Sequence, residues 1–163
     1  MNYLEITKCD ISNGLGIGVC LWVAGCNLHC KGCHNPSSWC FNAGRAFDDN
    51  AKAELFAALD KPWVDRFTLT GGHPFAPLNI LPCLELISDI KTRYPNIKIW
   101  VYTGYLFENL DTQVLKDIDV IVDGSYVEEQ RDITIAFRGS RNQRIIDVQQ
   151  SLKQGKTITL QND

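Results

Sequence analysis

The 163-residue sequence lacks any apolar run that approaches the roughly 20 residues needed to span a bilayer. Its amino terminus, Met1-Asn2-Tyr3-Leu4-Glu5, lacks the basic start and the apolar stretch of a signal peptide. An excess of positive charge is also missing: the formal net charge is -3, and phosphate affinity requires a basic surface. We therefore expect a cytoplasmic protein with neither a membrane nor a nucleic acid as its partner.

Repeats, low-complexity tracts and linkers are missing as well, so we expect a single domain over residues 1–163. A disulfide framework is not expected, because the seven cysteines are an odd number and a cytoplasmic compartment is reducing. What the sequence does contain is a cluster: three of the seven cysteines fall within eight residues. Clustered cysteines in such a compartment favour metal binding or catalysis.

Strand-like and helix-like segments alternate along the chain. The predicted strands are 19–23, 66–70, 97–102 and 119–124, and the predicted helices are 51–59, 79–93 and about 110–116. This alternation is typical of βαβ units and indicates an α/β fold with a mostly parallel sheet. A closed eight-stranded barrel typically needs about 250 residues, so we predict a partial, open parallel β/α barrel.

Chemically informative segments follow each predicted strand. The cysteine cluster follows the first strand, Gly71-Gly72 the second, 102–105 the third and Asp123-Gly124 the fourth. Ligands of parallel sheets bind at the carboxyl ends of the strands. These segments are therefore predicted to meet on one rim.

Cys26, Cys30 and Cys33 form a C-x3-C-x2-C pattern. Thiolates are soft ligands that suit iron–sulfur clusters and zinc. A structural zinc site usually closes with four ligands, whereas three cysteines on a cubane leave one iron open to a substrate. The spacing favours the cluster and leaves two alternatives: a zinc site completed by His29 or His34, and a set of buried free cysteines.

Five further motifs occur in a fixed order with this pattern. They lie at 10–16, 70–74, 100–105, 119–124 and 138–143. Together with the cysteines, they resemble the radical S-adenosylmethionine superfamily. Within it they are most similar to the small glycyl-radical-activating enzymes of anaerobic ribonucleoside-triphosphate reductase, over nearly the whole chain.

This resemblance implies an oxidoreductase that works under anaerobic conditions. Cys26, Cys30 and Cys33 would bind a [4Fe–4S] cluster, and S-adenosylmethionine would chelate the fourth iron. Its cleavage to a 5′-deoxyadenosyl radical would generate a glycyl radical on the large subunit of anaerobic ribonucleotide reductase, with a flavodoxin-like electron donor. The residues implied to contact S-adenosylmethionine are Gly32, Cys33, His34, Gly71, Gly72, His73 and Asp123.

Three positions depart from the family pattern. His34 stands where an aromatic residue is usual, Gly18 stands where an arginine is frequent, and His73 replaces an acidic residue. A neutral imidazole offers one acceptor, and a protonated one offers none. If His73 faces the methionine ammonium, ligand binding is predicted to strengthen as the pH rises through the histidine range.

Two rival functions remain open: activation of a different glycyl-radical enzyme, and a non-catalytic metal-binding partner protein. An arginine-rich segment (Arg131, Arg138, Arg141 and Arg144) is either a docking face for the reductase or a solvated basic face. Cys9, Cys20 and Cys83 are expected to pack in the core, and Cys40 is the spare thiol closest in sequence to the cluster.

Overall fold

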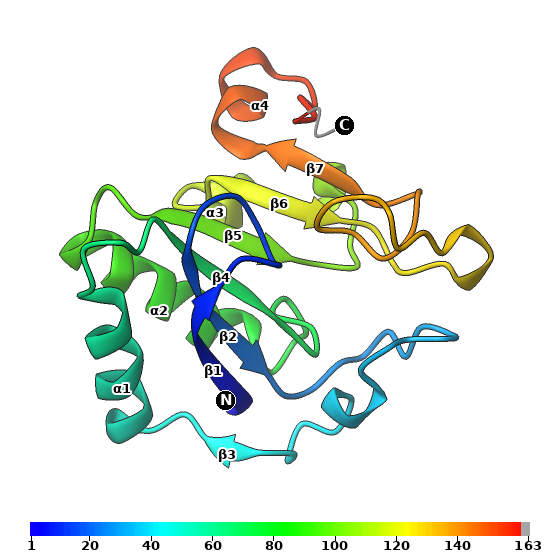
Figure 1. The fold of residues 1–163 in the computed structure, drawn as a ribbon. Helices are drawn as coiled ribbons and strands as arrows, with labels where there is room; N and C mark the ends of the chain where they lie inside the picture. Colours follow the sequence, from blue (N-terminus) through cyan, green and yellow to red (C-terminus); the bar gives the residue numbers. More distant parts are fainter. Residues whose placement is uncertain (161–163) are drawn as a thin grey trace.

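The computed structural model describes residues 1–160, which fold as one open, twisted sheet with helices packed against it (Figure 1). The strands are β1 (Asn2–Asp10), β2 (Gly18–Val23), β3 (Arg45–Ala46), β4 (Arg66–Gly71), β5 (Lys98–Tyr102), β6 (Val120–Asp123) and β7 (Arg144–Asp147). The α-helices are α1 (Asp49–Leu59), α2 (Ile80–Arg93), α3 (Thr112–Leu115) and α4 (Val148–Gln154). No helix in this part of the chain is long and apolar enough to cross a membrane.

The sheet has the strand order β3-β1-β2-β4-β5-β6-β7. Its centre, β2-β4-β5-β6, is parallel, whereas β1 pairs antiparallel with both β2 and β3, and β7 pairs antiparallel with β6. The prediction of an α/β fold is therefore confirmed. The prediction of a mostly parallel sheet holds only for the centre, because antiparallel strands flank it on both sides.

The outer face of the sheet forms the main core. Alternate strand residues pack there against the apolar faces of α1 and α2. The strand residues are Val19, Leu21, Val23, Phe67, Leu69, Ile99, Val101, Ile121 and Ile146. The helices contribute Leu55, Leu59, Leu86, Ile87 and Ile90. α1 is capped at its amino end, since the Asp48 side chain accepts a hydrogen bond from the Ala51 N–H at 2.9 Å.

The inner face of the central strands carries larger and more polar side chains. Trp22 and Thr70 are direct register partners on β2 and β4, and both face a cavity that Tyr102 of β5 also lines. Further toward the amino ends of the strands, the buried Arg66 guanidinium binds the Asp10 carboxylate at 2.8 Å and the Asn13 carbonyl at 2.8 Å. Toward β2 and β4 the inner face thus holds polar groups, whereas toward β6 and β7 it carries a second apolar cluster that includes Trp100, Val120, Val122 and Ile145.

Four of these strands and α-helices were not predicted: β1, β3, β7 and α4. β1 lies beside β2 near the sheet edge and is only partly buried, so its sequence lacks a continuous apolar run. β7 has four residues, and α4 begins directly after it with Asp147 as its cap. Cys9 lies on the exposed part of β1, so its expected core position is wrong, whereas Cys20 and Cys83 are buried as expected.

Candidate functional site

A single cavity lies at the carboxyl ends of the parallel strands. Its walls come from the cysteine loop (residues 24–40), the β4 and β5 ends, and the long β6–β7 connection (residues 124–143). In Figure 1 the cysteine loop and the β6–β7 connection both extend beyond this edge of the sheet. Of the predicted site residues, the lining includes Cys26, Cys30, Cys33, His34, Gly72 and His73. The predicted meeting of separate motifs on one rim is therefore present.

The three clustered cysteines line this cavity together. Cys26 is buried, and Cys30 and Cys33 are partly buried. Within residues 1–160 they are not grouped closely enough to hold a single metal ion. Burial and the neighbouring thiols of Cys26 and Cys33 raise the pKa of the Cys30 thiol.

Backbone N–H groups already point at the sulfur atoms. The Leu28 N–H donates to Cys26 Sγ at 3.4 Å, and the Asn35 N–H donates to Cys33 Sγ at 3.4 Å. A backbone N–H beside sulfur is attracted to negative charge on that atom, such as the charge of a sulfur that binds iron. Soft, hydrogen-bonded sulfur ligands around one cavity are a donor set that fits an iron–sulfur cluster.

The cysteine loop is held in shape by its own return segment. The Gly25 N–H donates to the Ser38 carbonyl at 2.7 Å, and the Cys26 N–H donates to the Trp39 carbonyl at 3.0 Å. His29, in the left-handed region with φ +48°, lies with its ring centroid 4.8 Å from that of Trp39. His29 thus packs on an indole, whereas His34 lines the cavity.

The double glycine permits close approach of the β4 end to the cysteine loop. Gly71 has φ +104°, and a Cβ there would lie 2.7 Å from the Val23 carbonyl oxygen. A Cβ on Gly72 would overlap the Gly25 carbonyl oxygen. Any side chain would therefore separate the two segments, which explains glycine at both positions. Gly72 lines the cavity, and Gly71 lies behind it.

His73 is buried, with 1% of its surface exposed, and both ring nitrogens have partners. Nδ1 lies 2.8 Å from Asn27 Oδ1, and Nε2 lies 2.9 Å from Thr103 Oγ1. Burial lowers the pKa of His73 to about 4, so the ring is neutral at physiological pH. Both ring nitrogens are already engaged by Asn27 and Thr103, and the lowered pKa predicts no titration of His73 in the ordinary histidine range.

The contacts of His73 close a ring of hydrogen bonds that begins and ends at Tyr105. The Tyr105 N–H donates to Thr103 Oγ1 at 3.1 Å, which leaves the Thr103 hydroxyl proton for His73 Nε2. His73 Nδ1–H then donates to Asn27 Oδ1, and Asn27 Nδ2 donates to the Tyr105 hydroxyl at 2.9 Å. The single acceptor of the neutral imidazole is used by Thr103. His73 thus ties the β4 and β5 ends to the cysteine loop.

Residues 12–146 match the model of the family described as "4Fe-4S single cluster domain". An anaerobic ribonucleoside-triphosphate reductase-activating protein of Haemophilus influenzae is 41% identical over 150 residues, covering 89% of this chain and 97% of the relative. The protein of the same name from Enterobacteria phage T4 is 42% identical, with 89% and 93% covered, and that of Escherichia coli K12 is 36% identical, with 88% and 96% covered. The chain belongs to this family of activating proteins.

The cofactors of such an activating protein are a [4Fe–4S] cluster and S-adenosylmethionine. The cavity offers the three cysteine sulfur atoms that a cluster would need. Gly18 lacks the cation that an arginine would supply at this position, and a neighbouring strand carries one instead. Gly18 is the register partner of Arg66, whose guanidinium fills the space that a side chain at position 18 would need. A buried cation is thus present on the adjacent strand.

Three predicted contacts of the activating protein, Gly32, Gly71 and Asp123, lie outside the cavity lining. The Asp123 carboxylate is fully buried and accepts from the Phe107 N–H at 2.8 Å and from Arg144 Nε at 3.0 Å. The next residue, Gly124, lines the cavity instead. Gly32 lies against the Glu128 carboxylate on the β6–β7 connection. Asp123 therefore anchors the end of β6 rather than facing the ligand.

Several lining residues were not singled out from the sequence. They are Trp22, Leu28, Trp39, Ser125 and Tyr126. The lining residues Asn13, Thr70, Gly139 and Gln143 lie within the motifs at 10–16, 70–74 and 138–143, and residues 102–104 and 124 belong to the predicted rim. Trp22 could have been found from strand alternation, because it lies on the inner face opposite the helix-covered residues. Trp39 and Tyr126 carry no local signal, because loop geometry brings them to the cavity.

Proposed function

We propose that this chain activates anaerobic ribonucleoside-triphosphate reductase by generating a glycyl radical on it. When bound, the reduced [4Fe–4S] cluster and S-adenosylmethionine would supply the radical chemistry that removes a hydrogen atom from the glycine, and Cys26, Cys30 and Cys33 would hold the cluster. The observation that carries the proposal is the joint lining of one cavity by Cys26, Cys30 and Cys33 beside Gly72, at the carboxyl ends of parallel strands.

The chain's own residues would bind, orient and shield. Cys26, Cys30 and Cys33 would hold the cluster, with backbone N–H groups stabilising their thiolates. Gly72 would let the backbone approach S-adenosylmethionine closely, as glycine does beside ligands. Gly32, His34 and Gly71 would border the same ligand, whereas His73 and Asp123 would act on it only by holding neighbouring segments.

The hydrogen-bond ring at His73 would fix the geometry of the site. It joins the cysteine loop to two strand ends, so the cluster ligands and the ligand-binding backbone would move as one unit. Preorganised groups bind a ligand at lower entropic cost than mobile ones. We infer that the methionine end of S-adenosylmethionine is held by groups other than the His73 ring.

The open sheet is proposed to be a partial barrel of the radical S-adenosylmethionine type. Four parallel strands carry the site at their carboxyl ends, and polar and aromatic side chains occupy the inner face.

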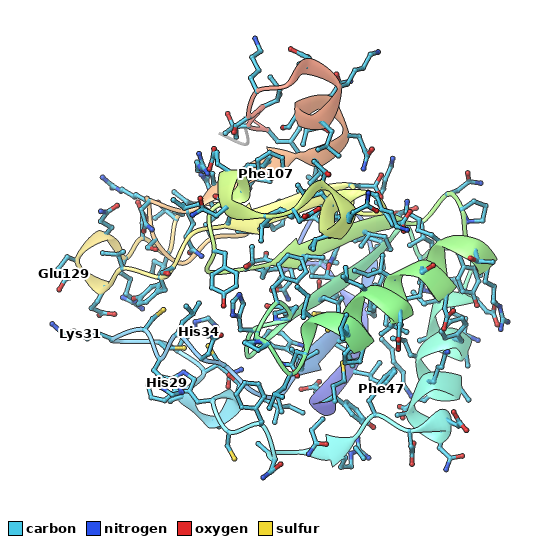
Figure 2. All side chains as sticks on the ribbon, turned by 180° about the vertical axis from the view of Figure 1, so that it is seen from behind. His29, Lys31, His34, Phe47, Phe107 and Glu129 are labelled. Atoms are coloured by element: carbon cyan, nitrogen blue, oxygen red, sulfur yellow. The ribbon has the colours of Figure 1, made fainter. Side chains whose placement is uncertain are left out.

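The electron donor is proposed to be flavodoxin-like. The same end of the molecule presents Lys31 and Glu129, which form a solvent-exposed ion pair at 3.5 Å between the cysteine loop and the β6–β7 connection (Figure 2).

The proposal is tested by anaerobic reconstitution with iron and sulfide, followed by addition of dithionite and S-adenosylmethionine. The native protein should hold close to four irons per chain and release 5′-deoxyadenosine. Cys26→Ala, Cys30→Ala and Cys33→Ala should each lose the cluster and the cleavage. Cys40→Ser and Cys83→Ser are matched controls that should retain both.

An intact cluster in Cys30→Ala would refute the ligand assignment. Stoichiometric zinc in place of iron, together with no cleavage in any preparation, would favour a non-catalytic metal-binding protein instead.

A further inference from the structure

The indole N–H of Trp39 is a buried donor that lacks a partner. Among the described residues 1–160, only two buried side-chain polar atoms lack a hydrogen bond, and Trp39 Nε1 is one of them. A buried donor without an acceptor costs about 1–3 kcal/mol, and native proteins rarely retain one without a reason. No acceptor among residues 1–160 satisfies this N–H.

The position of this N–H suggests its acceptor. Trp39 lines the same cavity as Cys26, Cys30 and Cys33. Its backbone carbonyl accepts the Cys26 N–H at 3.0 Å, and its ring packs on His29, within the loop that joins Cys26 to Cys30. The backbone of Trp39 is thus tied to the cysteine loop, and its indole packs on a side chain of that loop.

The neighbouring tryptophan of the cavity provides a contrast. Trp22 also lines this cavity, but its Nε1 donates to Thr7 Oγ1 at 3.0 Å. Both indoles therefore border the same space, and only that of Trp39 has an N–H free to bind what the cavity holds. The cluster adds sulfide and thiolate sulfur atoms there, all of which accept hydrogen bonds.

We propose that Trp39 Nε1–H donates a hydrogen bond to a sulfur of the [4Fe–4S] cluster and raises the cluster's reduction potential. The proposal rests on the proposed function only in requiring the cluster in this cavity. Reduction adds an electron whose negative charge spreads onto the sulfur atoms, so a donor to sulfur stabilises the reduced state more than the oxidised state. Hydrogen bonds to sulfur are among the factors that set cluster potentials.

The first measurement is a redox titration of reconstituted Trp39→Phe, followed by electron paramagnetic resonance without S-adenosylmethionine. Phenylalanine keeps an aromatic ring against His29 and removes the N–H. At a fixed potential, the oxidised-to-reduced ratio should rise by about three- to tenfold, where tenfold corresponds to about 59 mV for a one-electron couple. Trp22→Phe is the matched control and should leave the ratio unchanged.

An unchanged ratio in Trp39→Phe, with four irons retained, would overturn the inference and leave the proposed function intact. An equal change in Trp22→Phe would also overturn it, since loss of any cavity indole would then suffice.

The second measurement covers the case in which Trp39→Phe fails to retain a cluster. The native protein is labelled with ¹⁵N in its indoles, and the reduced cluster is examined by pulsed electron paramagnetic resonance. An indole nitrogen coupling should be present before S-adenosylmethionine is added. Absence of the coupling, or its appearance only after addition of S-adenosylmethionine, would show that the cluster is not the acceptor.

Discussion

The Nε2 atom of His73 lies 2.9 Å from the hydroxyl oxygen of Thr103, inside a site where only 1% of the His73 surface is exposed. Asn27 Oδ1 can only accept, so Nδ1 of the neutral ring carries the proton and Nε2 accepts from the Thr103 hydroxyl. A position where this chain departs from its family thus forms a structural link between strand ends. The effects of pH on ligand affinity and on the free energy of unfolding can be measured separately.

Binding of S-adenosylmethionine should show no titration step from His73 between about pH 6 and about pH 8.5. The pKa of His73 is lowered to about 4 by burial, so the ring is neutral throughout this range. The affinity of cluster-loaded native protein is to be compared with that of His73→Gln, which has no titratable group. The ratio of the two dissociation constants should stay constant, and a change in it near neutral pH would contradict a buried, neutral His73.

Folding stability should depend on the same group in more acidic solution. An unfolded histidine takes up a proton near pH 6.5, whereas folded His73 does so at about 4, so acid favours the unfolded chain. The stabilisation is fully present above about pH 6.5 and is lost as the pH falls toward 4. Between pH 7 and pH 5 the loss should be about 2 kcal/mol.

Urea unfolding of native protein and His73→Gln, each under anaerobic conditions, measures this loss. The free energy of unfolding of the native protein should fall more steeply with acid than that of the variant. Parallel curves would mean that His73 takes up its proton equally in both states.

The Arg66–Asp10 pair should be essential for stability. Both side chains are buried and lie 2.8 Å apart, and the pKa of Asp10 is lowered because hydrogen bonds from Arg66 and Asn13 outweigh the opposing effect of burial. Arg66→Met leaves a buried carboxylate unpaired and should cost about 3–5 kcal/mol in urea unfolding. Arg93→Met breaks an exposed pair with Asp60 and should cost far less, because solvent screens that pair.

If Arg66→Met and Arg93→Met lower the free energy of unfolding by equal amounts, the buried Arg66–Asp10 pair contributes no more to stability than the exposed Arg93–Asp60 pair. Restoration of stability in the double variant Arg66→Met with Asp10→Leu would support the pairing, since replacement of both charges removes the unpaired carboxylate.

The sequence was sufficient to predict the elements with strong apolar patterns. β4, β5 and β6, together with α1 and α2, are within two residues of their predicted bounds because burial on the outer face requires a continuous pattern. β1 and β7 escaped prediction because they flank the parallel centre, where partial burial permits polar residues. Edge strands are specified by pairing partners that a local pattern does not contain.

The same distinction applies to the site. Residues that follow strands, such as Gly72, were predictable from topology, because parallel strands end on one rim. The hydrogen-bond ring of His73 was not, since Asn27 and Thr103 are 46 and 30 residues away from it in sequence. The burial of the Asp123 carboxylate was not predictable either, because it depends on a contact with Arg144, which lies on a strand that was not predicted.

The arginines of the β6–β7 connection should differ in role. Arg144 bridges Asp123 and Glu108, and Arg141 lies 2.8 Å from Asp132 but is largely exposed. Arg138 donates only to the carbonyl of Ala136 among the described side-chain contacts. We expect Arg138→Gln with Arg141→Gln to weaken glycyl-radical formation on the reductase more than uncoupled S-adenosylmethionine cleavage.

Arg144→Gln is the contrasting variant for that comparison. It leaves the buried Asp123 without its cation and should lower the free energy of unfolding. Equal losses of coupled and uncoupled activity in the Arg138 and Arg141 double variant would refute a docking role.

The most direct test of the central claim is electron paramagnetic resonance of the cognate anaerobic reductase after incubation with this protein, dithionite and S-adenosylmethionine. The account predicts a doublet from a glycyl radical, which collapses to a singlet when the reductase carries glycine deuterated at its α-carbon. Cys30→Ala should give no signal. Absence of the doublet, in a preparation that holds four irons and cleaves S-adenosylmethionine, would contradict the assignment of this reductase as the target.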